Sequence, residues 1–560
     1  MPFHPKSFVL TALSALTLAA CAPGRGSTPE PAPAPTPVPT LPETLTTPTP
    51  EPTPPSAAPV IAEAPRNWQL LDPTADRVPG ISAERAEREL LAGRQPRRTV
   101  VVAVLDGGVD TAHADLRANL WTNAKERPGN GKDDDGNGYV DDVRGWNFIG
   151  GRDGRNVEHD TYELTREYVR CTNGAQSASE RCGRVKQDFE KKRAEATQLA
   201  QQVRMVEGAL GRVKQVLGQA LGTDSLTPER VMALQPTGPE VQQARQVYLQ
   251  LAASGITPDA VAEAKEQTTS QLEYGLNPSY DPRAIVGDDY ANVTQRRYGN
   301  ADVMGPDAEH GTHVAGIIGA VRGNNVGVDG VAPAVRIMGV RTVPNGDERD
   351  KDVANAIRYA VDNGAHIINM SFGKAYSPGK AVVDEAVKYA DSRGVLMVHA
   401  AGNDGENVDS APSFPIAPYQ GGGRAQNWIE VGASSWRGGD SLVASFSNYG
   451  RGNVDLFAPG VDVLSTAPGG KYERNSGTSM AAPVVSGVAA LLMAYYPTLT
   501  AADVKRIILA SVTPIGEQQV VRPGASGEKV PFASLSATGG IVNVYNAVRM
   551  AEEASGSTRP

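Results

Sequence analysis

Three polar residues lie at points in the chain where a side chain can do chemistry. Asp106 directly follows the apolar run VVVAVL, His310 opens the small apolar stretch HGTHVAGIIGAV, and Ser479 opens the apolar stretch SMAAPVVSGVAALLMAYYP. Taken singly, they are explained as a turn carboxylate, a structural histidine and a helix N-cap. Taken together, they can form an activated nucleophile, because a histidine accepts the serine proton near neutral pH and a buried carboxylate orients the imidazole.

Two other kinds of hydrolytic site do not fit these residues. His310 and His313 lack the HExxH spacing of a zinc protease. Ser479 lies in GTSMA, which is not the GxSxG elbow of the α/β-hydrolases. The chain order Asp, His, Ser is the order found in subtilisin.

The surrounding chain alternates predicted strands and helices. Short apolar runs at 100–105, 335–340, 365–370, 395–401 and 429–433 predict buried strands, and the patterns at 351–364 and 380–394 predict helices. Such alternation predicts an α/β fold with three layers, in which helices cover both faces of a parallel sheet. Ligand sites in these sheets lie beyond the carboxyl ends of the strands, where Asp106 is expected.

Six sequence blocks then carry a family resemblance. VAVLDGGVDTAHADL, HGTHVAGIIGA, INMSFG, AAGNDG, DLFAPG and NSGTSMAAP resemble the subtilisin-like serine proteases, or subtilases. The resemblance implies that Asp106 orients His310, that His310 is the general base and acid, and that Ser479 is the nucleophile. It also implies that the Asn403 amide donates to the oxyanion, as such donors do in acyl transfer.

The same resemblance implies how a substrate binds. Ser371, Phe372 and Gly373 match the strand that pairs with the substrate backbone, and Gly402 belongs to the same predicted substrate site. We therefore expect a serine endopeptidase with protein or peptide substrates. The alternatives are a catalytically silent binding lipoprotein on this scaffold and a serine esterase. The residue after Asp106 is Gly107, where many subtilases carry serine, and no segment resembles the family's folded inhibitory propeptide.

A long insertion separates Asp106 from His310. Residues 151–278 are rich in Gln, Ala, Glu, Arg and Lys, and an apolar stripe recurs every three or four residues at Leu199, Val203, Val206, Leu210, Val213 and Leu217. Thr227-Pro228 and Thr257-Pro258 predict the starts of two further helices. We expect two to four helices, forming either a self-packed hairpin or a lid or partner-docking element. Cys171 and Cys182 at its start predict one disulfide in an exported protein.

The N-terminus predicts export and a lipid anchor. Lys6 and the apolar stretch 8–20 have the layout of a secretory signal, and Leu18-Ala19-Ala20-Cys21 resembles the lipobox of bacterial lipoproteins. We expect residues 1–21 to be the signal with Cys21 lipidated, 22–65 a proline-rich tether, 66–551 the catalytic domain and 552–560 a tail. The expected location is a bacterial membrane, facing the periplasm or the exterior.

A segment rich in oxygen ligands lies just before the insertion. In NGKDDDGNGYVDD, the residues Asp133, Asp135 and Asn137 are spaced as in the first half of an EF-hand loop, and Tyr139 with Asp141 or Asp142 could complete a calcium shell. Position 12 is Arg144, so the alternatives are a shorter calcium loop and an Asp/Asn/Gly turn. By resemblance, Asp115 and the loop around Asn325 match another subtilase calcium site, although that loop is one residue shorter here.

Composition narrows the remaining possibilities. The chain has 560 residues, a formal charge of −9 and only three cysteines. An acidic chain argues against a nucleic-acid partner, since such domains are usually basic. No motif points to an organic cofactor, and nothing in the sequence indicates the oligomeric state.

Overall fold

The computed structural model describes residues 63–173 and 179–556. Cys21, the predicted signal peptide and nearly all of the predicted tether lie outside the described residues. Helix α13 (Val544–Ala554) continues three residues past the boundary expected for the catalytic domain.

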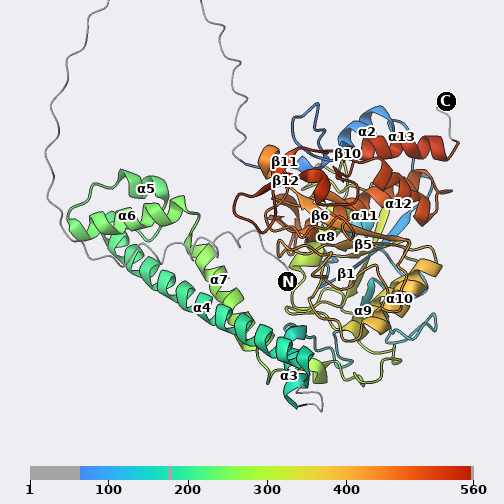
Figure 1. The fold of residues 1–560 in the computed structure, drawn as a ribbon, viewed down its shortest axis with the longest axis horizontal. Helices are drawn as coiled ribbons and strands as arrows, with labels where there is room; N and C mark the ends of the chain where they lie inside the picture. Colours follow the sequence, from blue (N-terminus) through green and yellow to red (C-terminus); the bar gives the residue numbers. More distant parts are fainter. Residues whose placement is uncertain (1–62, 174–178, 557–560) are drawn as a thin grey trace, which may run out of the picture.

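A nine-stranded sheet forms the centre of the body (Figure 1). The strand order is β10-β13-β7-β6-β5-β4-β1-β3-β2, and neighbouring strands are parallel except for β10 and β13. The strands are β1 (Val100–Asp106), β2 (Gly145–Asn147), β3 (Val335–Arg341), β4 (Ile367–Met370), β5 (Leu396–Ala400), β6 (Trp428–Ser434), β7 (Leu456–Pro459), β10 (Thr513–Pro514) and β13 (Gly540–Ile541). The five predicted strands are confirmed as β1, β3, β4, β5 and β6.

The shorter elements connect and flank this sheet. Two hairpins pair β8 (Val463–Ala467) with β9 (Lys471–Asn475) and β11 (Gln519–Val521) with β12 (Lys529–Pro531). Single 3₁₀ turns lie at η1 (Trp68–Leu70), η2 (Arg117–Asn119), η4 (Pro282–Ile285), η5 (Gly439–Ser441) and η6 (Phe532–Ser534).

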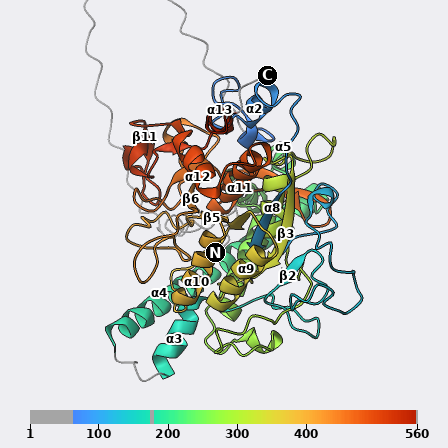
Figure 2. The same ribbon diagram turned by 90° about the vertical axis from the view of Figure 1, so that its right-hand side faces the viewer.

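Helices cover both faces of the sheet, so the predicted three-layer α/β/α fold is confirmed. Along β1, Val102 and Val104 enter the core beneath α8 (Glu309–Gly319) and α11 (Thr478–Tyr495), whereas Ala103 and Leu105 face α9 (Asp350–Asp362) and α10 (Lys380–Ser392). This alternation follows the two-residue period of a strand that is buried on both sides. Helices α2 (Ala83–Glu89), α12 (Ala501–Ala510) and α13 add to the α8–α11 layer (Figure 2).

Helix α11 passes through the centre of its layer. Within residues 63–173 and 179–556 it is the one helix long and apolar enough to cross a bilayer, and all 18 of its residues are buried inside the body.

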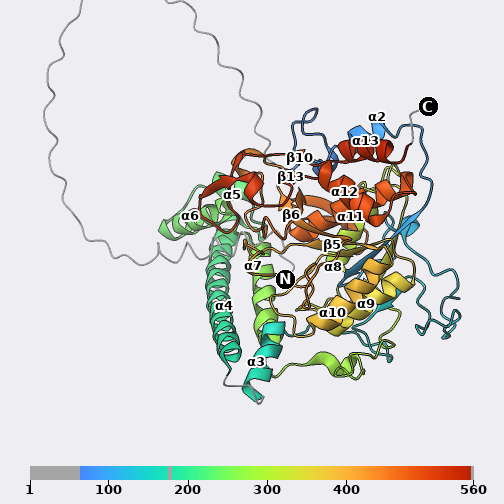
Figure 3. The same ribbon diagram turned by 45° about the vertical axis from the view of Figure 1, so that its right-hand side comes forward.

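The insertion projects from the body as a helical arm (Figures 1 and 3). The described residues of the arm form α3 (Glu163–Asn173), α4 (Glu180–Leu221), α5 (Pro228–Ala233), α6 (Pro239–Ala253), α7 (Pro258–Ser270) and the π turn η3 (Gln271–Gly275). The described residues of the arm thus form five α-helices, which is more than the two to four expected. Helices α4, α5 and α7 lie where the apolar stripe and the two Thr-Pro pairs predicted helices, whereas no pattern was assigned to α3 and α6.

The predicted apolar stripe forms the cores of the arm. Val203 packs against residues of α6 and α7, whereas Leu217 packs with residues of α5 and α6. Thr227 and Thr257 cap α5 and α7 as predicted, since their hydroxyls accept backbone N–H bonds from Arg230 and Ala260. The arm thus has hydrophobic cores of its own.

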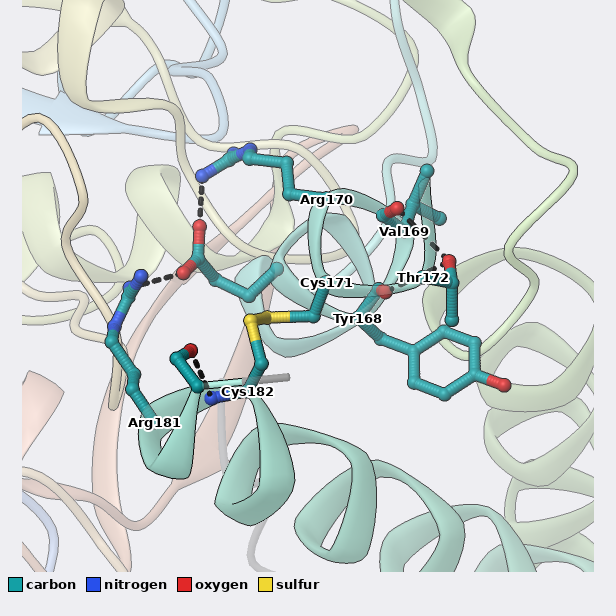
Figure 4. Close-up of a disulfide and its surroundings, with 9 residues drawn as sticks. Tyr168, Val169, Arg170, Cys171, Thr172, Arg181 and Cys182 are labelled. Carbon is teal, nitrogen blue, oxygen red and sulfur yellow. Dashed lines mark hydrogen bonds and ion pairs between the residues drawn. A yellow bond between two sulfur atoms is a disulfide. The ribbon is translucent and has the colours of Figure 1, made fainter. Parts of the chain in front are cut away.

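A disulfide and an ion cluster close the base of the arm. Cys171 of α3 and Cys182 of α4 are joined, with their Cα atoms 5.3 Å apart (Figure 4). Beside this bond, Arg170 and Arg181 both pair with the buried carboxylate of Glu167. These contacts hold the first turns of α4 against α3, which is the helix nearest the body.

Candidate active site

The three chemically notable residues come from three different elements. Asp106 ends β1, His310 lies in the first turn of α8 and Ser479 lies in the first turn of α11. The Asp106 Oδ1 atom lies 2.7 Å from His310 Nδ1 and also accepts the backbone N–H of Gly107 at 2.8 Å. The structure thus brings the predicted acid and base together across a gap of more than two hundred residues.

This approach depends on a residue without a side chain. A Cβ atom on Gly311 would lie 2.2 Å from the carbonyl oxygen of Gly108 and 3.0 Å from the Asp106 Cβ. Any larger residue would therefore push the start of α8 away from the end of β1. Gly311 allows His310 to reach the buried carboxylate.

Asp106 controls the protonation of His310. Burial lowers the pKa of His310, but the charge and the hydrogen bond of Asp106 outweigh it, so the pKa of His310 is raised above its ordinary value. The imidazole Nε2 is buried and has no hydrogen-bond partner among the described residues. The arrangement can therefore hold a proton on an imidazole whose second nitrogen is available to a reacting group.

The Ser479 hydroxyl faces a carbonyl group in this structure. Its Oγ atom donates to the carbonyl oxygen of Ser371 at 3.1 Å, and the residue is 5 % exposed. Ser371 also lines a small cavity together with His310. The serine hydroxyl must turn away from Ser371 before it can donate to His310, and active-site contacts of this kind commonly tighten only when substrate binds.

A proline in α11 explains part of this geometry. Pro483 has no N–H group, so it cannot bond to the carbonyl four residues earlier, which belongs to Ser479. That carbonyl instead accepts the Ser371 hydroxyl at 2.9 Å. The proline thereby leaves an acceptor that holds the segment after β4 against the first turn of α11.

The oxygen atom of the Asn403 side-chain amide is held by two hydrogen bonds from Thr478. Its Oδ1 accepts the backbone N–H of Thr478 at 2.8 Å and the Thr478 hydroxyl at 3.0 Å. A Cβ atom placed on Gly477 would lie 3.7 Å from Asn403 Nδ2 and 3.5 Å from the backbone nitrogen of Ser479. One point beside the serine is therefore close to two nitrogen donors.

Other polar residues, to which the sequence analysis assigned no role, also shape this region. Asn369 donates to the Ser371 hydroxyl and accepts from Ser486, which ties the predicted substrate strand to α11. Asn448 donates to the Ala401 carbonyl and accepts two backbone N–H groups of the following loop. Asn369 and Thr478 had a signal, because they lie inside the INMSFG and NSGTSMAAP blocks, whereas Asn448 had none.

A cleft runs from Ser479 to the arm. It has a volume of about 560 Å³ and is lined by Phe372, Gly373, Gly402, Asn403 and Ser479 from the body and by Asp188, Lys191, Lys192 and Glu195 from α4. Gly402 has φ +105°, and a Cβ atom there would lie 2.4 Å from Asn448 Nδ2. All four residues of the predicted substrate site therefore lie beside Ser479, and the base of the arm forms the opposite wall.

Buried ion pairs fasten the arm to this wall. Lys374 directly follows the predicted substrate strand, and its Nζ lies 3.0 Å from Glu163 of α3 and 2.9 Å from Asp350 of α9. Glu163 also pairs with Arg166 at 2.7 Å. Burial raises the pKa of Glu163, but Lys374 and Arg166 outweigh it, so the pKa is held well below its usual range.

The predicted calcium residues lie in one loop, where the Asn137 backbone N–H donates to both Asp133 and Asp135. Oxygen atoms of Asp133 and Asp135 lie within 4.8 Å of one another and of Glu126, a residue that sequence reasoning missed. Asp142 is buried and accepts from Asn123, Asn137 and Tyr359, and burial raises its pKa to about 6.

The remaining predicted ligands lie elsewhere in the loop. Asp141 accepts the backbone N–H groups of Asn130 and Gly131, and the Asn137 Oδ1 accepts the Tyr139 N–H. At the second predicted site, Asp115 accepts from Asn324, Val328 and Tyr472, and Asn325 lies in the turn beside it with φ +57°.

The comparison with protein families agrees with this geometry. The sequence profile of the subtilase family matches residues 97–527, which is most of the chain. The chain therefore belongs to the subtilase family.

Individual relatives match over shorter stretches. The chain is 42 % identical over 238 residues to a thermophilic serine proteinase of Bacillus sp. (strain AK1), which covers 42 % of this chain and 54 % of the relative. It is 38 % identical over 216 residues to subtilisin Savinase of Lederbergia lenta, covering 38 % of this chain and 74 % of the relative. The matched region is thus only about half the length of the first of these relatives.

Solved structures are similar to this one. A protease from Pseudoalteromonas arctica PAMC 21717 covers 87 % of this chain and 98 % of its own, with a TM-score of 0.46 and 21 % identity. The prenylagaramide maturation protease PagA covers 43 % of this chain and 82 % of its own, with a TM-score of 0.36 and 31 % identity.

Proposed function

We propose that this protein is a serine endopeptidase that hydrolyses peptide bonds through an acyl-enzyme. The observation that carries the proposal is the 2.7 Å contact between Asp106 and His310, together with Ser479 in the first turn of α11. His310 takes the proton of Ser479 as the hydroxyl attacks the substrate carbonyl, and returns it to the leaving amine. Water then attacks the acyl-enzyme with His310 again acting as the base.

The developing oxyanion has two donors in this proposal. Asn403 Nδ2 and the Ser479 backbone N–H are both close to one point beside the serine, and the start of α11 adds the positive end of its dipole. Since Asn403 Oδ1 is occupied by Thr478, its amide nitrogen is directed toward the cleft. Such a preorganised pair stabilises charge that appears only in the transition state.

The substrate lies in the cleft in an extended form. Ser371, Phe372 and Gly373 add it as a further strand, while the four α4 residues meet it from the arm side. This places the arm as a wall of the cleft, in addition to being a self-packed helical element.

A fluorophosphonate probe tests the catalytic claim. We expect a covalent adduct on Ser479 in folded protein, and Ser479→Ala should abolish both the adduct and peptide hydrolysis while leaving the melting temperature unchanged. No adduct would favour the silent binding scaffold. Hydrolysis of esters without hydrolysis of casein would favour the esterase.

We also propose one structural calcium ion at the 126–135 loop. Glu126 is 6 % exposed, and its Oε2 is buried with no hydrogen-bond partner among the described residues, which suits an oxygen site for a hard cation. Glu126, Asp133 and Asp135 would hold the ion, which would supply charge neutralisation. A melting temperature that chelator leaves unmoved, in both the native protein and Glu126→Gln, would reject this site.

Export and lipid anchoring complete the proposal. The relatives named as subtilisins support an exported enzyme, and the lipobox-like segment ending at Cys21 supports a lipid on that cysteine. Cys21→Ala should move the protein from the membrane fraction to the soluble fraction after expression in a bacterial host. Unchanged membrane association would reject the anchor.

A further inference from the structure

Two hollows share the segment Phe372–Gly373 in their lining. One is the cleft that contains Ser479 and Asn403. The other is smaller and contains Asp106 and His310, and both are lined by Phe372 and Gly373. The predicted substrate strand is thus the shared wall between the two hollows.

This arrangement assigns neighbouring substrate side chains to different hollows. Successive side chains of an extended peptide point to opposite sides. If the residue whose carbonyl is attacked places its side chain in the cleft beside Ser479, the residue before it points toward the smaller hollow beside His310. The chemistry of the smaller hollow therefore selects the penultimate residue on the acyl side.

The smaller hollow is rich in carboxylates. Besides Asp106, it is lined by Glu158, Asp307 and Glu348. Glu348 is 2 % exposed, its Oε1 is buried with no hydrogen-bond partner among the described residues, and burial raises its pKa to about 7. Asp307 is exposed and accepts from two neutral donors, the Glu309 N–H and the Asn345 amide.

The cationic side chains that line this hollow already have hydrogen-bond partners in the protein. His310 is paired with Asp106, and Arg341 is the other cation of the lining. The Arg341 guanidinium donates to the Asn147 side chain and to the Val157 carbonyl. Burial lowers the pKa of Arg341 to about 10 but leaves it charged near neutral pH. The exposed Asp307 and Glu158 outnumber this arginine. Glu348, with a pKa of about 7 and the charge of Lys374 nearby, is only partly ionised near neutral pH and adds a smaller negative charge, so the hollow is acidic.

We propose that the smaller hollow is a specificity subsite for a lysine or arginine at the substrate position immediately before the cleaved residue. The inference rests on the proposed endopeptidase function and goes beyond it by naming the substrate class. A long cationic side chain would pass the exposed carboxylates of Asp307 and Glu158 and bring its charge toward Glu348. An acidic side chain at the same position would be repelled.

Peptide substrates that differ at one position test the proposal. Three fluorogenic peptides carry lysine, norleucine or glutamate at the penultimate position and are otherwise identical. We expect kcat/KM to fall in that order, with lysine about tenfold above norleucine. Each enzyme variant is characterised by the ratio of its kcat/KM for the lysine peptide to its kcat/KM for the norleucine peptide. A substitution that alters His310 changes both kcat/KM values by the same factor, so it leaves this ratio unchanged.

Substitutions in the smaller hollow then show which residues cause the preference for lysine. Asp307→Asn and Glu348→Gln should each lower the ratio by about three- to tenfold, since each removes one partner of the cation. Asp404→Asn is the matched control, because Asp404 lines the cleft and not the smaller hollow. It should leave the ratio unchanged. If the buried Glu348 variant does not fold, the exposed Asp307 and Glu158→Gln keep the test decisive.

The failures of the two proposals are distinguishable. Hydrolysis of all three peptides at equal rates, or a ratio unmoved by every variant, overturns the acidic subsite and leaves the endopeptidase intact. Hydrolysis of none of them, with no fluorophosphonate adduct on Ser479, overturns the endopeptidase and the subsite with it.

Discussion

Replacing Asp106 by asparagine separates charge from geometry at this site. Asp106 Oδ1 receives both His310 Nδ1 and the Gly107 N–H, whereas Oδ2 is buried without a partner among the described residues. An amide can satisfy the Gly107 N–H only with its oxygen. We therefore expect the amide oxygen to remain at the Oδ1 position, so that the imidazole keeps its tautomer and loses only the neighbouring negative charge.

The size of the effect follows from that charge. A carboxylate and an imidazolium whose centres are about 4 Å apart interact by about 4 kcal/mol at an effective dielectric constant of 20. That energy corresponds to about a 10³-fold loss in kcat/KM, because 1.36 kcal/mol is one power of ten. Without Asp106, burial is the main influence left on His310, so its pKa should fall below the ordinary value.

The assay is kcat/KM measured against pH for the native protein and Asp106→Asn. His310 must be neutral to act as a base, and Asp106 raises its pKa, so native activity should rise with pH through that raised value. In the variant, the plateau should be about 10³-fold lower and the acidic limb should lie at lower pH. Retained near-UV circular dichroism controls for folding.

Three outcomes would refute the reasoning. A loss of less than tenfold would mean that the charge of Asp106 contributes little to the transition state. An acidic limb that stays in place or moves to higher pH would mean that Asp106 does not set the pKa of His310. A loss above about 10⁴-fold would contradict the expected amide orientation, because that is the cost of the wrong tautomer.

Three further changes test the supporting structure. Thr478→Val removes a hydroxyl that holds Asn403 Oδ1, and it should lower kcat/KM by about ten- to a hundredfold in steady-state assays, because small misplacements of catalytic groups are costly. Replacing both Cys171 and Cys182 by serine opens a link of 11 residues and should lower the free energy of unfolding of the arm by about 3 kcal/mol in denaturant titrations. Glu163→Gln should lower the free energy of unfolding by about 3–5 kcal/mol, since it leaves buried cations without their partner.

The controls and the pH dependence sharpen these tests. Thr500→Val removes a helix-capping hydroxyl far along the chain and should leave kcat/KM unchanged, unlike Thr478→Val. Because the folded-state pKa of Glu163 is lowered, its stabilisation is present above the ordinary carboxyl pKa and is lost as pH falls through the folded value. The native protein should therefore lose stability in acid more steeply than Glu163→Gln. Equal loss of stability in acid for the native protein and Glu163→Gln would contradict the role given to Glu163. An arm without Cys171 and Cys182 that is as stable as the native arm would contradict the role given to the disulfide.

Local patterns in the sequence were enough to predict the layers of the body. The runs that became β1, β3, β4, β5 and β6 are mostly apolar because both faces of the sheet are covered, and they alternate with amphipathic helices. The strands missed, such as β2, β7 and β13, have two to four residues, too few for a pattern to appear. The arm was predicted as helical from one apolar stripe and two Thr-Pro helix starts, but the expected two to four helices fall short of the five that the described residues form.

For the candidate site, the sequence by itself determined which residue types could act and where the chain places them relative to strands and helices. Only the tertiary structure decided that Ser479 faces Ser371, that Glu126 joins Asp133 and Asp135, and that Glu348 lines the hollow beside His310. The physical reason is that capping, periodicity and turn preferences act between near neighbours in the chain. Hydrogen bonds, burial and electrostatic fields act between residues that only the folded sheet and the anchored arm bring together.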